Sequence, residues 1–144
     1  MIEKWKPAYE FEGKYEVSNT GKVRSKKTGK ILRPCLSAGY YSVGLCKQGS
    51  VFHRTIHRLV LESFVGPIGK RFCADHLDGN RKNNLLSNLR IVTYSENIKH
   101  GYRLGRIVKK GQDNNNAKIN NRIVRQIRSL RRKGFSNLEL AKRF

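Results

Sequence analysis

The chain has 144 residues, and its 31 Lys and Arg side chains against 10 Asp and Glu give a formal charge of +21 at pH 7. A folded domain carries such an excess mainly when its partner is a polyanion, so nucleic acid is the leading candidate. The 38% hydrophobic content is enough for one modest core. No apolar run approaches the ~20 residues of a membrane-spanning helix, and the N-terminus lacks an apolar signal core. We therefore expect a cytoplasmic protein without a membrane partner.

Short extended runs separated by turn signals are predicted for residues 5–45. Gly21 belongs to one turn, "KKTGK" makes a second, and "YYSVGLC" is a run of aromatic and β-branched residues typical of a strand. This pattern predicts a small antiparallel sheet. The next segment begins extended and turns helical near His57, and its apolar residues continue at helical spacing to Phe64 before Gly66 ends the helix.

The C-terminal third differs in composition from the rest. Residues 98–144 hold 14 Lys and Arg against 2 acids, a formal charge of +12. Glycines, amides and lysines without steady periodicity fill residues 103–118. This composition is typical of a basic linker, either extended along a phosphate backbone or a disordered spacer.

Apolar residues then return at helical spacing and predict a helix. They are Ile119, Ile123, Ile127 and Leu130. Gly134 suits the C-cap of this helix, and a second short helix is predicted behind Ser136. Helix, glycine turn and helix resemble the first half of a helix-turn-helix unit, whose groove-reading helix we would expect after Phe144. A plain basic helical hairpin is the alternative.

The three cysteines, Cys35, Cys46 and Cys73, have no CxxC spacing, and their odd number predicts neither a disulfide framework nor a zinc knuckle. We expect buried free thiols. His53 and His57 in "HRTIH" could join a cysteine around zinc, but packing or a phosphate contact suits a strand that enters a helix better.

Asp75 and His76 open the segment with the strongest chemical signal, "ADHLDGNRKNNLLSNLRIVTYSENIKH". Hydrolysis of a phosphodiester needs a base that deprotonates water and a cation held by ligands that leave it accessible. An imidazole with a pKa near ~6.5 suits the first task and a carboxylate the second. Neighbouring residues on a strand point to opposite faces, so the two side chains would divide these tasks. A second ligand could come from Asn97, on a helix capped by Ser95 behind the returning strand "LRIVT".

The loop between the two strands is predicted to be held by its own polar side chains. Asp78, Gly79 and Asn80 suit a turn that tolerates left-handed backbone. Asn83 and Asn84 are expected to bond the loop's own backbone.

The order acid-histidine, middle asparagine and helical asparagine resembles the HNH nuclease family with its ββα-metal fold. Asp75 and His76 match the first element, Asn88 in "LLSNLR" the second and Asn97 the third. The stretch "WKPAYEFEGKYEVSNTGKVRS" is similar to the N-terminal module of phage HNH homing endonucleases. The resemblance implies that His76 is the general base, that Asp75 and Asn97 bind one divalent cation, and that Asn88 pins the loop through backbone hydrogen bonds.

Asn97 departs from the family pattern, because many members have a second histidine at that position. A carboxylate and an amide oxygen together favour Mg²⁺ or Mn²⁺ over Zn²⁺. His100, three residues further on, is predicted to contact solvent or phosphate rather than the cation.

We therefore predict an α+β chain of four parts. Residues 1–66 form a β-rich DNA-contacting module with a small antiparallel sheet plus helix, 67–102 the ββα-metal catalytic motif, 103–118 a basic linker, and 119–144 a basic helical tail that is a partial helix-turn-helix. The predicted DNA-contacting side chains are Arg54, Arg58, Arg81, Lys82, Arg103, Arg106, Lys109, Lys110, Arg122, Arg125 and Arg128.

The predicted function is that of a metal-dependent endonuclease, phage-encoded, acting as a monomer on double-stranded DNA in the cytoplasm of a bacterial host cell. One catalytic motif per chain predicts nicking, in homing or in packaging. A non-catalytic DNA-binding regulator would explain the charge but leave Asp75 and His76 without a task. An RNA-binding protein would explain the charge alone, because the sequence has no array of stacking aromatic residues.

Overall fold

The computed structural model describes residues 2–106 and 119–144 and divides the chain into two compact units, Met1–Gly101 and Tyr102–Phe144. The α+β class is confirmed. No helix in the described residues is long and apolar enough to cross a membrane.

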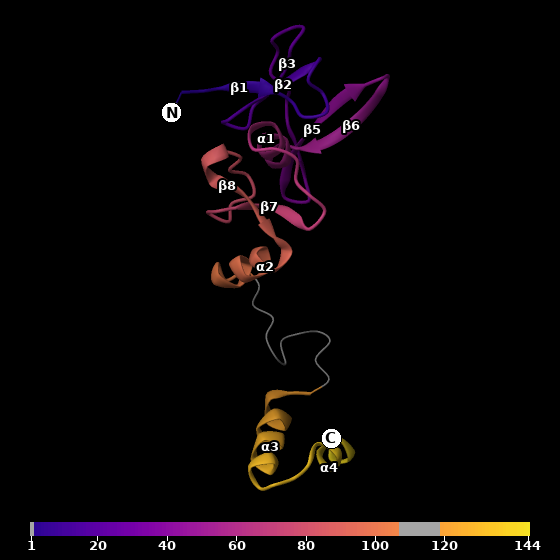
Figure 1. The fold of residues 1–144 in the computed structure, drawn as a ribbon, viewed down its shortest axis with the longest axis vertical. Coiled ribbons are helices and arrows are strands. Elements are labelled where there is room, and N and C mark those ends of the chain that lie inside the picture. The colour runs from indigo at the N-terminus through magenta and orange to yellow at the C-terminus, as the bar shows by residue number, and fades with distance from the viewer. Residues whose placement is uncertain (1, 107–118) are drawn as a thin grey trace. The chain divides into compact units, whose positions relative to one another are not determined.

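Two three-stranded antiparallel sheets form the N-terminal part of the first unit, in the orders β1-β2-β3 and β4-β5-β6 (Figure 1). Their strands are β1 (Trp5–Pro7), β2 (Tyr15–Ser18), β3 (Val23–Ser25), β4 (Cys35–Ser37), β5 (Tyr40–Lys47) and β6 (Ser50–Thr55). The sequence predicted antiparallel pairing correctly but only one sheet. The second sheet begins directly after Pro34, which has no backbone N–H to donate to a ladder.

The hairpin between β5 and β6 shows why the second sheet forms locally. Lys47 pairs with Ser50, and the two residues between them, Gln48 and Gly49, have φ of 51° and 80°. Positive φ at both positions is the type I′ turn, whose twist matches that of the strands it joins.

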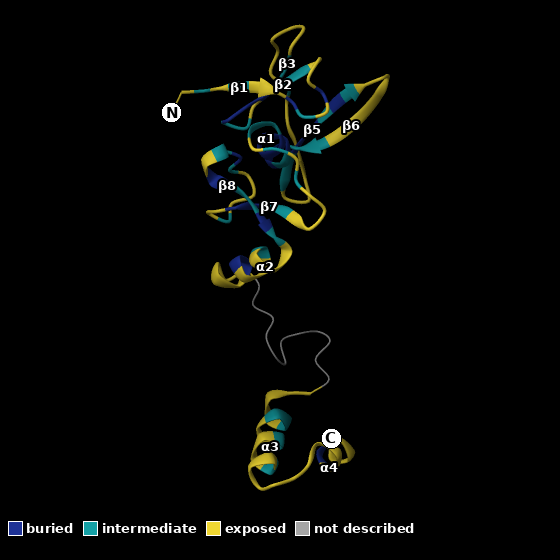
Figure 2. Cartoon of the chain, in the orientation of Figure 1, coloured by how far each residue is buried: buried dark blue, intermediate teal, exposed yellow. Residues whose placement is uncertain are grey.

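Helix α1 (Ile56–Phe64) follows β6 directly, as predicted, and lies at the centre of the first unit. Most of its residues are buried, and dark blue is visible at the helix in Figure 2. Its side chains Leu59, Val60 and Leu61 are buried to 1% exposure or less. The same core cluster takes Val17, Val23, Val43 and Leu45 from the sheets and Leu89 from the segment that carries the chemistry. That segment therefore shares one core with the N-terminal sheets.

The predicted order of strand, loop, strand and helix is confirmed for the second half of this unit. Strand β7 (Phe72–His76) pairs antiparallel with β8 (Leu89–Thr93), and the loop between them ends in a 3₁₀ turn, η1 (Leu86–Asn88). Helix α2 (Tyr94–Arg103) follows.

The cap of α2 was predicted at Ser95, two residues too late. Thr93 caps the helix instead, because its Oγ1 accepts from the backbone N–H of Glu96 at 3.3 Å while the Glu96 carboxylate accepts from the backbone N–H of Thr93 at 2.9 Å. This reciprocal capping box uses the "TYSE" sequence. It places Asn97 one residue after the box, in the first turn and a half of α2.

The second unit contains α3 (Asn121–Arg132) and α4 (Asn137–Arg143). Asn120 caps α3, so Ile119 lies before the helix rather than on its apolar face, and the expected face begins at Ile123. Gly134 has a φ of 93° after α3, as a left-handed C-terminal position requires. Ser136 and Glu139 form a capping box at the start of α4. Whether the two helices belong to a helix-turn-helix stays a prediction.

All three cysteines are free thiols. The expectation that they are buried is wrong for Cys35, which is exposed on β4, and only partly met by Cys46 and Cys73, whose exposure is intermediate. In a three-residue strand whose residues are all exposed, no neighbouring layer covers the Cys35 thiol.

Candidate active site

Asp75 and His76 are neighbours on β7, and their side chains enter different surroundings. Asp75 contacts Arg90 of β8 and His100 of α2, whereas His76 contacts Asn84 of the loop. Both are buried, each with 4% of its surface exposed. The alternation of a strand therefore separates the carboxylate from the imidazole.

One oxygen of the Asp75 carboxylate, Oδ2, lies next to both Arg90 and His100. Arg90 donates to Oδ2 from Nε at 3.0 Å and from Nη2 at 2.7 Å. His100 Nδ1 lies 2.8 Å from the same oxygen, although it is not aligned as a hydrogen bond. These contacts do not involve the other oxygen, Oδ1. Oδ1 is thus the oxygen on which a cation could bind.

The prediction that His100 contacts solvent or phosphate is wrong. Its side chain is buried, with 8% of the residue exposed, beside Asp75. Residues three apart on a helix share a face, so His100 follows Asn97 onto the side of α2 that meets β7. This spacing was available in the sequence and could have identified the contact.

Asn97 reaches the same face of β7 as Asp75. Its side chain lies beside the thiol of Cys73, which is two residues before Asp75 on the strand. Burial raises the pKa of the Cys73 thiol, and the negative charge of Asp75 raises it further. A carboxylate and an amide on one face form a donor set that fits a hard divalent cation.

The zinc alternative finds no support, because the described residues hold no group of three His, Cys, Asp or Glu side chains that could bind a metal ion. His53 is exposed on β6, while His57 is buried on α1. Packing, the other expectation for this pair, is what the structure shows for His57.

On the other side of β7, His76 belongs to a group of stacked rings. Its ring centroid lies 5.1 Å from that of His57, which in turn lies 4.8 Å from that of Tyr40. The guanidinium carbon of Arg81 lies 4.9 Å from the Tyr40 ring centroid. Burial lowers the pKa of His57 to about 4, and the neighbouring charges of His76 and Arg58 lower it as well. His57 is therefore neutral at pH 7, and its buried Nδ1 has no hydrogen-bond partner in the described residues.

Asn88 ties together the loop between β7 and β8. Its Oδ1 accepts from the backbone N–H of Asp78 at 3.1 Å, and its Nδ2 donates to the Asp78 carboxylate and to the backbone carbonyl of Asn83, each at 2.9 Å. Gly79 has a φ of 74° in the turn expected there. These contacts join the beginning of the loop to its end.

Asn84 does not behave as predicted. Asn83 accepts from the backbone N–H of Leu85 at 3.4 Å, as expected of it, whereas the side chain of Asn84 faces His76. The sequence gives two identical amides in a row, and only the packing of the loop distinguishes them.

Comparisons with known proteins agree with this geometry. The family model described as HNH endonuclease matches residues 54–99, and the NUMOD4 motif matches residues 3–46. A solved structure described as DNA binding and cleavage by the HNH homing endonuclease I-HmuI has a TM-score of 0.65 and 35% sequence identity, and the match covers 90% of this chain and 68% of that one. The chain belongs to the HNH endonuclease family.

Curated HNH relatives include DNA endonuclease I-HmuI of Bacillus phage SP01, which is 42% identical over 97 residues, or 67% of this chain and 56% of the relative. An uncharacterized HNH endonuclease of Acanthamoeba polyphaga mimivirus is 40% identical over 100 residues, which are 69% of this chain and 30% of the relative. A putative HNH homing endonuclease from the SPbeta prophage of Bacillus subtilis is 33% identical over 114 residues, 76% of this chain and 65% of the relative. The matched part of this HNH chain thus spans between 30% and 65% of the length of these three relatives.

The cations predicted to contact DNA have different surroundings in this HNH protein. Arg54 and Arg58 both form ion pairs with the buried carboxylate of Glu62, at 2.7 and 3.1 Å, so part of their charge is balanced within the fold. Lys109 and Lys110 lie outside the described residues. The remaining predicted side chains are exposed, namely Arg81, Lys82, Arg103, Arg106, Arg122, Arg125 and Arg128.

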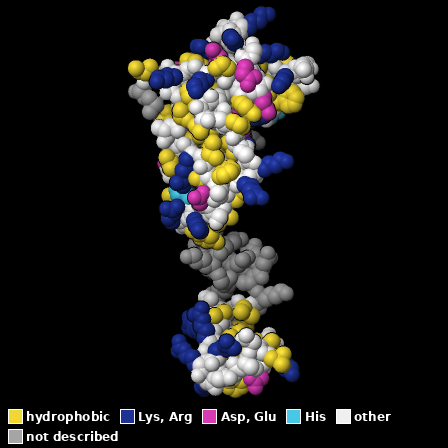
Figure 3. All heavy atoms as spheres, in the orientation of Figure 1, with side chains coloured by type: hydrophobic (Ala, Val, Ile, Leu, Met, Phe, Trp, Pro, Cys, Tyr) yellow, Lys and Arg dark blue, Asp and Glu magenta, His cyan; other side chains and the backbone are white. Residues whose placement is uncertain are grey.

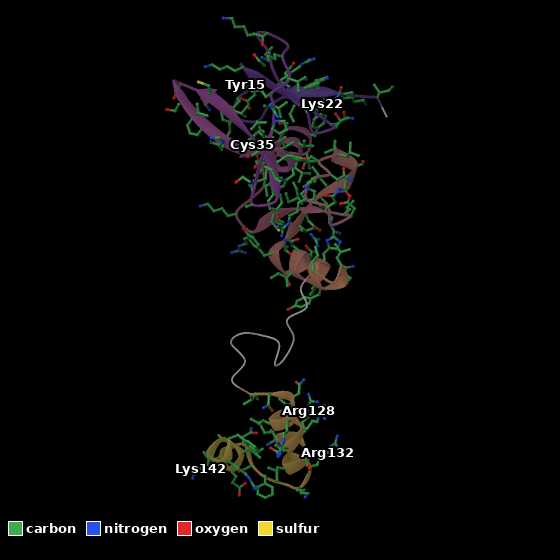
Figure 4. The ribbon with its side chains drawn as sticks, turned by 180° about the vertical axis from the view of Figure 1, so that it is seen from behind. Tyr15, Lys22, Cys35, Arg128, Arg132 and Lys142 are labelled. Atoms are coloured by element: carbon green, nitrogen blue, oxygen red, sulfur yellow. The ribbon has the colours of Figure 1, made fainter. Side chains whose placement is uncertain are left out.

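Lys and Arg side chains clearly outnumber Asp and Glu on the face of each unit seen in Figure 3. In the second unit Arg128 and Arg132 lie along α3 and Lys142 lies on α4 (Figure 4). None of the residues of α3 is buried. Both units therefore offer positive charge to a polyanion.

Proposed function

We propose that this HNH protein is a divalent-cation-dependent DNA endonuclease that nicks one strand of duplex DNA. The observation that carries the proposal is the division of labour on β7: the Asp75 carboxylate lies on the face that Asn97 reaches, and the His76 imidazole lies on the other. The names of its relatives, which include DNA endonucleases and homing endonucleases, support the reaction class.

In this proposal His76 accepts the proton of the attacking water, since an imidazole is the side chain whose pKa suits that task near neutral pH. Asp75 and Asn97 would hold one Mg²⁺ or Mn²⁺. When bound, such a cation supplies positive charge to the scissile phosphate and the leaving oxygen. Arg90 fixes the Asp75 carboxylate through Oδ2, which leaves Oδ1 for the cation. Asn88 keeps the intervening loop closed.

The exposed Arg and Lys side chains would contact DNA phosphates, which position the duplex without choosing its sequence. One base and one cation per chain serve one strand, so a monomer would nick rather than cut both strands. We propose a homing role in a phage-infected bacterial cell over a packaging role, because two relatives carry homing endonuclease in their names or titles.

The test is conversion of supercoiled plasmid to the open-circular form with Mg²⁺, with Mn²⁺ and with EDTA. We expect open circles with either metal and none with EDTA. His76→Ala should bind DNA in a gel-shift assay as the unmodified chain does and fail to nick. His53→Ala is the matched control, because His53 is exposed on β6, away from this group of rings. Binding without nicking by the unmodified chain would overturn the proposal and favour the DNA-binding regulator.

A further inference from the structure

Asn84 is the polar side chain of the loop that faces His76. Its Oδ1 lies 3.4 Å from His76 Nε2, and both residues are buried, with 7% and 4% of their surfaces exposed. An amide oxygen can only accept a hydrogen bond. The contact therefore requires the hydrogen on Nε2, and in a neutral ring the lone pair is then on Nδ1.

A turn of the N-terminal sheet packs against the backbone of Asn84. Gly21, in the turn between β2 and β3, has a φ of 85°, and a Cβ on it would lie 2.8 Å from Asn84 Cβ and 3.2 Å from the Asn84 carbonyl oxygen. The backbone N–H of Leu86 donates to the carbonyl oxygen of Asn19, in the same turn, at 2.9 Å. The close approach depends on the absence of a side chain at Gly21.

We infer that Asn84 is a positioning residue for His76, and that the β2–β3 turn holds Asn84 against it. The inference rests on the proposed function, because it takes His76 as the base. In this arrangement the base of the proposed function acts through Nδ1. The inference also makes residues 19–21, which are 55 or more positions before His76, part of the support of the active site.

The physical reason is tautomer control. A neutral imidazole has one donor and one acceptor nitrogen, and the hydrogen bond at one nitrogen decides which is which. A base whose lone pair points away from the water cannot accept its proton, so loss of the orienting contact lowers the rate of the chemical step. Binding of DNA through exposed cations would not change.

Two substitutions of similar volume separate orientation from packing. Asn84→Asp keeps an oxygen acceptor, whereas Asn84→Leu removes it. In full-length protein labelled with ¹⁵N on its four histidines, we expect a His76 ring proton on Nε2 in the unmodified chain and in Asn84→Asp. In Asn84→Leu this proton should exchange too fast to observe. Single-turnover nicking by Asn84→Leu should fall about 10- to 100-fold with unchanged KM for DNA, as for other orienting side chains.

Gly21→Ala tests the role of the turn, and Gly29→Ala is its matched control. Gly29 also has a positive φ, 69°, but nothing lies within 4 Å of a Cβ placed there. Both substitutions strain the backbone, and only Gly21→Ala pushes on Asn84. We expect Gly21→Ala to lose the Nε2 proton signal as Asn84→Leu does, and Gly29→Ala to keep it.

The spectroscopic outcome is independent of cleavage. A His76 proton on Nδ1, or an Nε2 proton that persists in Asn84→Leu, would overturn the inference even if the chain nicks DNA. A chain that cuts nothing but shows the expected Nε2 proton and its loss would overturn the proposed function and leave the contact between Asn84 and His76 established. Equal effects of Gly21→Ala and Gly29→Ala on the Nε2 proton signal would show that the β2–β3 turn does not hold Asn84 against His76.

Discussion

Arg90 and Asp75 lie directly opposite each other on β8 and β7, and two nitrogens of the guanidinium contact one carboxylate oxygen. The carboxylate is 3% exposed and the arginine side chain 36%. A buried charge that loses its partner destabilises a protein more than the intact pair stabilises it. Loss of one partner should therefore lower the stability of the fold, which can be measured without a cleavage assay.

Arg90→Met, which keeps most of the side-chain volume, should lower the free energy of unfolding by about 1–3 kcal/mol, with the partial exposure of Arg90 favouring the lower end. Urea denaturation at pH 7 measures it. In Asp75→Asn the neutral amide no longer needs the guanidinium, so Arg90→Met should have a smaller effect in that background. Lys22→Met is the control, since its pair with Glu3 is at the surface. Equal losses of unfolding free energy in Arg90→Met and Lys22→Met would contradict the prediction.

The cation site predicts a binding defect in two variants. Asp75→Ala and Asn97→Ala each remove one of the two oxygen donors, so the affinity for Mn²⁺ should fall at least about tenfold in either. Paramagnetic broadening of NMR signals from β7 and α2 reports this binding in the absence of DNA. Glu12→Gln removes an exposed acid from the N-terminal module and should leave the affinity unchanged. A variant that binds Mn²⁺ as the unmodified chain does would show that its residue is not a ligand.

His57 predicts how stability depends on pH. Its pKa of about 4 in the folded chain is below the ordinary value of 6.5, so between these pH values the unfolded chain binds a proton that the folded chain does not. The free energy of unfolding should therefore have its full value above pH 6.5. It should fall by about 3 kcal/mol as the pH decreases from 6.5 to 4. His57→Phe should flatten this dependence in urea titrations at several pH values. His53→Phe is the control, because His53 is exposed. A similar flattening in His53→Phe would show that His57 does not cause the pH dependence of stability.

Strong local patterns made much of the site predictable. The alternation along "ADH" separated Asp75 from His76, and "LRIVT" predicted β8 with the bounds that the structure has. The errors came from contacts between segments far apart in sequence. Nothing local distinguishes Asn84, which meets the turn at Gly21, from Asn83. The ion pair of Arg54 with Glu62 of α1 was not predicted either, while the contact of Arg54 with DNA stays a prediction. The metal, the nick and the roles of the site residues stay predictions.

The arginines of α3 predict a salt effect on DNA binding. Replacing Arg122, Arg125 and Arg128 together by Gln keeps helix propensity and removes three exposed charges. Each phosphate contact contributes about −0.9 to the slope of log K against log salt on duplex DNA, so the slope should flatten by up to about 2.7. Fluorescence anisotropy at salt concentrations from about 50 to about 200 mM measures this slope. Replacing the exposed Lys26, Lys27 and Lys30 by Gln removes the same charge, and equal flattening would show that net charge alone is responsible.

The division into two units predicts that nicking does not need the tail. The core that carries β7 and β8 lies within Met1–Gly101. Leu140, which is buried in the described part of the tail, belongs to the other unit. Deleting the chain from Gly111 onward should therefore leave a folded protein by circular dichroism. Its affinity for DNA should fall at physiological salt, because the positive charges of α3 and α4 are gone, while metal-dependent nicking stays detectable at low salt, where the remaining cations suffice. Sequence preference should change little, since phosphate contacts position a protein without choosing bases. A truncated chain that is folded and binds DNA at low salt but does not nick would show that the tail contributes to the active site.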